Sequence, residues 1–384
     1  MADAAYVHLP FCRRRCFYCD FPISVIGNKT EPDRFRPIEE YVGRVREEIE
    51  RTPIEGKPLR TIFFGGGTPS LVPDRSLAVI IDCLAGKFGL SPDIEISMEI
   101  DPATFPLDRL RGYVRAGVNR LSLGAQAFQD HLLEICGRSH RVADIYQAVD
   151  FIHRVGVENF SLDLISGLPH QTRQDWESSL EKAIELQPKH LSCYDLVLES
   201  VTPFGKQYKP GEKPLPDDET TAEMYKMASE RLREAGYDHY EISNYARSGF
   251  QCRHNRVYWE NRPYYGFGMG AASYTGGKRF TRPRTRKEYF DWVRDGCNIE
   301  VPETGEIDRL LETLMLGLRL AEGADLRAIE ADFGSEVKNS ILEVLQPHFR
   351  RDLVRLEGDR IRLTDPEGFL FSNRVLTDLF DRFE

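Results

Sequence analysis

Three cysteines stand close together near the N-terminus, within the stretch HLPFCRRRCFYCDF. Cys12, Cys16 and Cys19 follow the spacing Cys-x3-Cys-x2-Cys, and soft thiolates on one short loop select zinc or an iron–sulfur cluster over hard cations. A structural zinc site needs four protein ligands, whereas a 4Fe-4S cluster held by three thiolates keeps one iron free of a protein ligand. The pattern favours the cluster with an open iron. Zinc completed by His8 or by a distant residue is the alternative.

The surroundings of these three thiols bear on their chemistry. Arg13, Arg14 and Arg15 either lower the pKa of the neighbouring thiols or form an exposed, solvated run. Aromatic neighbours would exclude water from a cluster and tune its potential. The remaining cysteines are scattered singly, and we expect buried or inert thiols at Cys83, Cys136, Cys193, Cys252 and Cys297.

Alternating apolar runs and helical periods predict the elements that must position these residues. Strands are expected over 4–9, 59–64, 94–100, 119–126, 159–165 and 190–198, with helical stretches between them. Parallel strands need crossover helices, so this order predicts a parallel sheet. An open doubly wound sheet and a barrel both fit the alternation.

The polar residues of this region fall at the carboxyl ends of the predicted strands. They comprise the cysteine cluster, GGGTPS at 65–70, Glu99, Gln126 and Asp163. A barrel gathers its site from several loops at that end, whereas an open sheet uses one switch point. We therefore predict an α/β fold with a partial (β/α)6 TIM-like barrel over residues 1–245.

The pattern changes after the predicted barrel. Residues 246–300 are Gly-rich and aromatic, and we expect them to form an extension. Residues 301–384 read as helices plus one hairpin, which predicts a C-terminal winged-helix-like α+β domain. That domain carries 11 Lys and Arg against 18 Asp and Glu, so a packing role is expected rather than DNA binding.

GGGTPS is not a Walker A loop, because no Lys-Ser/Thr follows at the required spacing. Three glycines after a strand allow a close approach of the backbone to a ligand, and free N–H groups there suit a carboxylate. A simple tight turn explains the glycines equally well.

YVHLPFCRRRCFYCDF resembles the cluster motif of radical S-adenosylmethionine (SAM) proteins, and specifically that of the HemN/HemW family, which includes oxygen-independent coproporphyrinogen III dehydrogenase. The resemblance implies that SAM chelates the open iron and that an electron delivered to SAM can cleave it to a 5'-deoxyadenosyl radical. Whether one or two SAM molecules bind is left open. The positions at which the family contacts SAM correspond here to Tyr6, Tyr18, Gly66, Gly67, Thr68, Glu99, Gln126, Arg138 and Asp163.

Two features favour one branch of that family. The dehydrogenase has a further cysteine where this chain has Phe21, so the resemblance puts porphyrinogen oxidation in doubt. HNRVYW resembles the HNxxYW signature of the haem-chaperone branch, which implies haem contact by His254, Asn255, Tyr258 and Trp259. An imidazole is a natural haem ligand, although a core histidine beside a hydrogen-bonded Asn255 fits the same letters.

Composition and resemblance together predict the partners. A net charge of -10 argues against nucleic acid, and no apolar run approaches the ~20 residues of a membrane span. We expect a cytoplasmic haem chaperone that binds a 4Fe-4S cluster, SAM and haem, as a monomer or weak homodimer. Apo-haemoproteins would receive the haem, an electron donor would serve the cluster, and membrane contact would be transient. The alternative is a radical SAM enzyme that acts on a tetrapyrrole.

Overall fold

The computed structural model describes residues 1–27 and 31–383. A curved nine-stranded sheet forms the wall of a partial barrel, in the order β11-β1-β4-β5-β6-β7-β8-β10-β9. The neighbouring strands from β1 to β8 are all parallel, which confirms the predicted fold class. These six strands are β1 (Ala4–Leu9), β4 (Leu59–Gly66), β5 (Leu90–Ile100), β6 (Arg120–Gln126), β7 (Phe160–Ser166) and β8 (His190–Asp195).

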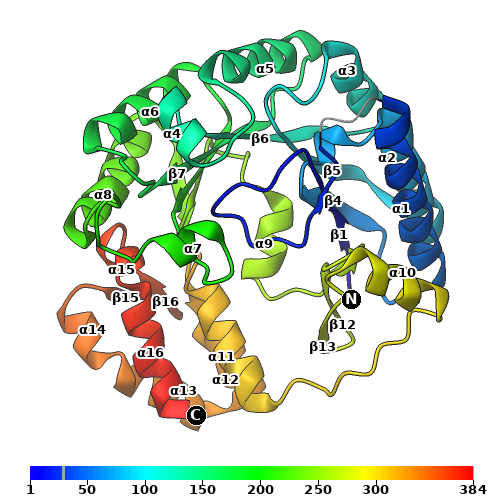
Figure 1. The fold of residues 1–384 in the computed structure, drawn as a ribbon. Helices are drawn as coiled ribbons and strands as arrows, with labels where there is room; N and C mark the ends of the chain where they lie inside the picture. Colours follow the sequence, from blue (N-terminus) through cyan, green and yellow to red (C-terminus); the bar gives the residue numbers. More distant parts are fainter. Residues whose placement is uncertain (28–30, 384) are drawn as a thin grey trace.

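Helices cover the convex side of this sheet (Figure 1). Each buries an apolar stripe; in α2, for example, Leu77, Ile80 and Leu84 are fully buried. A capping box begins α6, where the Thr172 hydroxyl accepts from the Asp175 N–H at 3.1 Å. The helices around the barrel are α1 (Glu31–Arg51), α2 (Asp74–Phe88), α3 (Leu107–Arg115), α4 (Asp130–Ile135), α5 (Val142–Val155), α6 (Arg173–Glu185), α7 (Pro203–Gln207) and α8 (Asp218–Glu234).

The sheet extends beyond the six predicted strands at both edges. β11 (Tyr265–Phe267) runs parallel beside β1, and β10 (Asn244–Ala246) runs antiparallel beside β8 and pairs with β9 (Asp238–Glu241). Strands of three or four residues are too short to show a period of two. The last predicted strand also ends earlier than expected, at Asp195.

Residues 246–300 are integrated with the barrel, because β11 joins its sheet beside β1. They form α9 (Arg253–Trp259), a hairpin of β12 (Ala272–Thr275) and β13 (Lys278–Thr281), and α10 (Arg286–Arg294). A buried ion pair of 2.7 Å joins Arg282 to Glu48 of α1. The boundaries proposed at 245 and 300 stay predictions.

The C-terminal region is an α+β layer with its own core around Leu314, Ile341 and Val375. Its three-stranded sheet has the order β14-β16-β15, with the predicted hairpin as β15 and β16. No helix within the described ranges is long and apolar enough to cross a membrane. The elements are α11 (Glu306–Gly317), β14 (Ala324–Asp325), α12 (Leu326–Phe333), α13 (Ser335–Val344), α14 (Gln346–Arg350), β15 (Val354–Glu357), β16 (Arg360–Leu363), α15 (Glu367–Leu370) and α16 (Ser372–Phe383).

Candidate functional site

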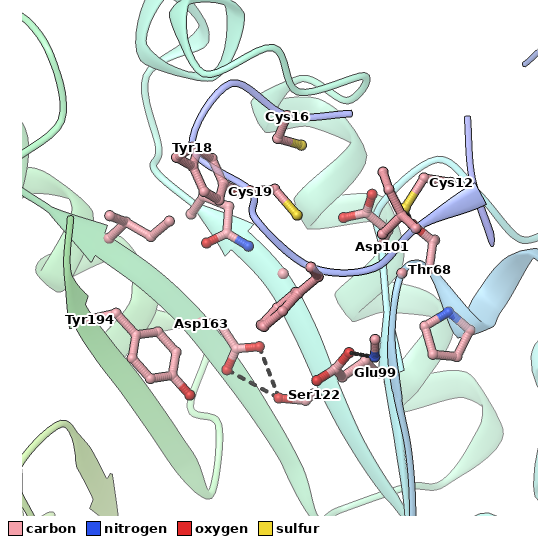
Figure 2. Close-up of a pocket in the computed structure, with 18 of the residues that line it drawn as sticks. Cys12, Cys16, Tyr18, Cys19, Thr68, Glu99, Asp101, Ser122, Asp163 and Tyr194 are labelled. Carbon is pink, nitrogen blue, oxygen red and sulfur yellow. Dashed lines mark hydrogen bonds between the residues drawn. The ribbon is translucent and has the colours of Figure 1, made fainter. Parts of the chain in front are cut away.

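The cysteine loop closes over the carboxyl ends of the strands. Its two ends are held together by β2 (Phe11–Cys12) and β3 (Ser24–Val25), which pair in parallel. Within the loop, the Arg15 guanidinium donates to the carbonyl oxygens of Cys19 and Phe21 at 3.0 Å each. Figure 2 shows the side chains of Cys12, Cys16 and Cys19 around one end of a cavity inside the barrel, which we call the barrel pocket.

The spread of the three thiols tests which metal fits them. In the described part of the chain, no three His, Cys, Asp or Glu side chains converge closely enough to hold a single metal ion. Zinc needs its ligands within about 2.3 Å of one point. The thiolates of a 4Fe-4S cluster each bind a different iron, so they lie farther apart. The three thiols therefore do not form a preassembled site for a single ion, and the choice of a cluster over zinc stays a prediction.

Burial favours the protonated form of two of the three thiols in the absence of a metal. Burial raises the pKa of Cys12 to about 12, against a hydrogen bond of 3.6 Å from the Thr68 hydroxyl. Burial also raises the pKa of Cys19, although Arg15 opposes the shift. Binding to a metal deprotonates such thiols outright.

Arg138, and not the Arg13–Arg15 run, supplies the guanidinium that contacts one of the three thiols. Arg138 Nη1 donates to Cys16 Sγ at 3.7 Å, and Nη2 donates to the Gly124 carbonyl at 3.0 Å. Asp101 forms a close ion pair with the same guanidinium. The buried Arg138 Nε has no hydrogen-bond partner among the described residues. Arg138 lines the barrel pocket, but its Nε is enclosed by protein atoms and does not face the pocket.

Glu99 supplies an acceptor in the same pocket. Its Oε2 accepts from the Gly66 N–H at 3.0 Å. Burial, with a smaller contribution from the charge of Asp163, raises the pKa of Glu99 to about 7. Tyr6 lies nearby on β1, with its hydroxyl 3.0 Å from His8 Nδ1. A carboxylate here suits the amino group or ribose hydroxyls of a ligand.

The backbone N–H groups of the glycine loop are hydrogen-bonded within the protein. This corrects the expectation that they are free to bind a carboxylate. The Gly66 N–H is bonded to Glu99, and the N–H groups of Gly67 and Thr68 donate to the carbonyl oxygens of Leu9 and Phe11 at 2.9 and 2.7 Å. These three amides are therefore not free for a carboxylate. All three residues still line the barrel pocket, so contact with a ligand would come through their other atoms.

The remaining residues predicted to contact SAM also line the barrel pocket. Gln126 ends β6 with a φ of +67°, after a shift in strand register. Tyr18 lies beside the cysteine loop's Cys16 and Cys19 (Figure 2). Asp163 accepts from the Ser122 hydroxyl at 2.9 Å (Figure 2), and burial raises its pKa. The structure brings all nine predicted positions together around one cavity.

Sequence reasoning missed several polar residues that share the lumen. Ser122 opposes Glu99 across the strand pair, and Ser192 opposes Asp163. Arg120 is almost fully buried and lines the same cavity. A signal for them was present: every second residue of these strands is polar, as in Glu95, Ser97, Glu99 and Asp101, in Arg120 and Ser122, in Ser161 and Asp163, and in His190 and Ser192.

The predicted haem segment is split between the core and the pocket. Asn255 and Tyr258 line the barrel pocket, whereas His254 is fully buried. Both ring nitrogens of His254 are within hydrogen-bond distance of hydroxyls, at 2.8 Å from Thr61 Oγ1 and 2.9 Å from the Tyr258 hydroxyl. The indole Nε1 of Trp259 has no partner among the described residues. In this arrangement neither His254 nitrogen is free for iron, and the haem contacts stay predictions.

Comparison with known families agrees with the fold. Residues 6–183 match the family model described as the radical SAM superfamily, and residues 306–371 match that of the HemN C-terminal domain. A solved structure described as coproporphyrinogen III oxidase (HemN) from Escherichia coli is 22% identical, with a TM-score of 0.82. The match covers 99% of this chain and 89% of that one. At this identity the likeness speaks for the fold alone.

Full-length relatives are more similar. "Heme chaperone HemW" of Synechocystis sp. is 48% identical over 405 residues, covering 100% of this chain and 98% of the relative. The protein of the same name from Bacillus subtilis is 34% identical, covering 97% of both chains. A mitochondrial "radical S-adenosyl methionine domain-containing protein 1" of Mus musculus is 34% identical and covers 83% of this chain and 74% of the relative. The chain belongs to the HemW family of the radical SAM superfamily.

Proposed function

We propose that this protein is a haem chaperone. It holds a 4Fe-4S cluster on Cys12, Cys16 and Cys19, binds SAM in the barrel pocket, and binds haem for transfer to apo-haemoproteins. The observation that carries the proposal is similarity over the whole chain to proteins named for haem chaperone activity. The three thiols at one end of a polar pocket support the cofactor part.

The chain's own residues define what each part of the pocket does. The three thiols would hold the cluster, and Tyr18 lines the same end of the pocket as Cys16 and Cys19. Glu99 accepts hydrogen bonds from the ligand, and the Arg138 guanidinium places a positive charge beside it. The cluster and SAM, when bound, supply one-electron chemistry.

Phe21 bears on the alternative of a tetrapyrrole-oxidising enzyme. It occupies the position of the dehydrogenase's additional cysteine, its side chain is 57% exposed, and it lines the mouth of the barrel pocket. A phenyl ring offers no ligand to iron or proton donor to a substrate. It does offer apolar area to a flat partner such as a porphyrin.

The decisive experiment is a transfer assay. Anaerobically reconstituted protein, loaded with haem, is mixed with an apo-haemoprotein, and recovery of the recipient's haem spectrum is followed. Transfer faster than from free haemin is expected. Conversion of coproporphyrinogen III by the same preparation with SAM and a reductant, without haem transfer, would contradict the proposal.

Partners beyond the recipients form part of the proposal. We expect an electron donor for the cluster, a monomer or weak homodimer, and transient membrane association at most. Size-exclusion chromatography with and without SAM and haem measures the oligomeric state directly. A stable higher oligomer would contradict this part.

A further inference from the structure

Helix α9, which carries the HNRVYW motif, lies inside the barrel rather than on its outer surface. In Figure 1 it sits within the curve of the sheet, behind the cysteine loop. Its residues bond to β4 and β5 well below the carboxyl ends of these strands, at Thr61 and Glu95. Asn255 and Tyr258 face the barrel pocket. The helix therefore forms the floor of the pocket that the cysteine loop closes from the other end.

A chain of hydrogen bonds fixes that floor from beneath. Thr61 on β4 bonds to His254 Nδ1, and His254 Nε2 bonds to the Tyr258 hydroxyl. The backbone N–H of His254 donates to Glu95 Oε1 at 3.2 Å, and the imidazole stacks on Phe63 with ring centroids 5.3 Å apart. Thr61 and His254 are buried and do not line the pocket. Neither is placed to touch a ligand there.

Tyr258 connects these hydrogen bonds to the residues that are predicted to contact SAM. Tyr258 shares the lining of the barrel pocket with Tyr6 and Glu99. Its ring is held on another side by Tyr264, edge to face at 4.7 Å. Two sides of the ring are thus fixed by protein, and the pocket borders the ring as well.

We infer that α9 is the positioning element of the barrel pocket, in which the Thr61–His254–Tyr258 chain holds Tyr258 against bound SAM. His254 is then a positioning residue for the SAM site and not an axial haem ligand. A histidine whose two nitrogens are both hydrogen-bonded must break one bond before it can bind iron. The inference rests on the proposed occupancy of the pocket by SAM.

Substitutions at Thr61 and Tyr258 test this chain of hydrogen bonds and keep the imidazole of His254. Thr61→Val removes the hydroxyl and keeps the shape, Thr61→Ser keeps the hydroxyl, and Tyr258→Phe removes the other partner of His254. In the anaerobically reconstituted full-length protein, Thr61→Val and Tyr258→Phe should weaken SAM binding roughly three- to tenfold. They should also alter the EPR spectrum of the reduced cluster with SAM. Thr61→Ser should stay within about twofold of wild type.

Tyr264→Phe is the matched control, because its hydroxyl bonds to Arg279 and not to the chain beneath Tyr258. Haemin affinity should be unchanged in Thr61→Val, Thr61→Ser and Tyr264→Phe. The inference is overturned if Thr61→Val and Tyr258→Phe bind SAM as wild type does, or if they lose haemin binding and keep SAM binding. Failure of wild type itself to bind SAM would overturn the proposed cofactor as well.

Discussion

The protonation of Glu99 should make ligand binding in the barrel pocket depend on pH. Burial and the neighbouring charge of Asp163 raise its pKa to about 7, and the Gly66 N–H only partly offsets them. At pH 6 the side chain is mostly protonated, and at pH 8 it is mostly a carboxylate that accepts hydrogen bonds from the ligand more strongly. We predict that SAM affinity rises between pH 6 and 8, measured by calorimetric titration at several pH values.

Glu99→Gln should flatten this dependence and weaken SAM binding about tenfold at pH 8, the scale of one lost charge-assisted hydrogen bond. Glu241→Gln is the control. Burial raises the pKa of Glu241 to about 7 as well, but its side chain does not line the pocket. Retention of the full pH dependence in Glu99→Gln would assign it to another group.

Substitution of single cysteines distinguishes the cluster ligands from neighbouring cysteines that do not bind iron. Cys136 lies next to the cysteine loop, since its carbonyl accepts from the Phe17 N–H at 3.0 Å, yet it does not line the barrel pocket. We predict that Cys16→Ala loses the cluster and that Cys136→Ala keeps about four irons and four sulfides per chain. Iron and sulfide analysis after anaerobic reconstitution measures both. Iron loss in Cys136→Ala would make it a fourth ligand.

At the scale of elements, the backbone conformation at the end of β4 requires a glycine at position 66. Gly66 has a φ of +114°, and a Cβ there would lie 2.4 Å from the His8 ring. His8 cannot withdraw easily, because its Nε2 bonds to the Pro22 carbonyl at 2.9 Å. Gly66→Ala should therefore displace β1 and the cysteine loop and reduce cluster content by half or more.

Gly43→Ala provides the comparison. Gly43 lies in α1 with nothing within 4 Å of an added Cβ, so alanine there should raise the free energy of unfolding by about 0.5–1 kcal/mol. Cluster content and urea unfolding of both variants test the pair. Equal cluster content in Gly66→Ala and wild type would show that the contact with His8 is not restrictive.

The strands show how far the sequence predicts the site. The six main strands and the cysteine motif follow from apolar runs and residue spacing, because each is a local signal. The partnership of Arg138 with Asp101 joins two different loops, and no local pattern contains it. The HNRVYW motif fits both a haem ligand and a core histidine at position 254. The burial of His254 depends on α9 folding into the lumen, which no local pattern predicts.

At the scale of the whole molecule, the barrel and the C-terminal region share a continuous backbone junction. The Ile242 N–H donates to the Arg319 carbonyl and the Ala321 N–H to the Tyr240 carbonyl, each at 3.0 Å. Helix α9 reaches the same junction, where Arg256 pairs with Glu322 at 2.9 Å. A ligand that contacts the floor of the pocket is thus one helix away from the C-terminal region.

Glu241 lies buried in this junction, and its Oε2 has no hydrogen-bond partner among the described residues. Burial raises its pKa from 4.5 to about 7, so the folded state binds the proton more tightly than the unfolded state. The associated stability is fully present below pH 4.5 and is lost as pH rises through about 7. The shift corresponds to a loss on the order of 3 kcal/mol.

Glu241→Gln removes this titration, because glutamine stays neutral at every pH tested. Relative to wild type, the variant should gain about 2–3 kcal/mol in the free energy of unfolding between pH 5 and pH 8. Urea denaturation of the apo-protein at pH 5, 6, 7 and 8 measures the difference, with the exposed Glu336→Gln as control. A constant difference between the two proteins across this range would mean that Glu241 reaches water in the folded state, and the junction would then be looser than its hydrogen bonds indicate.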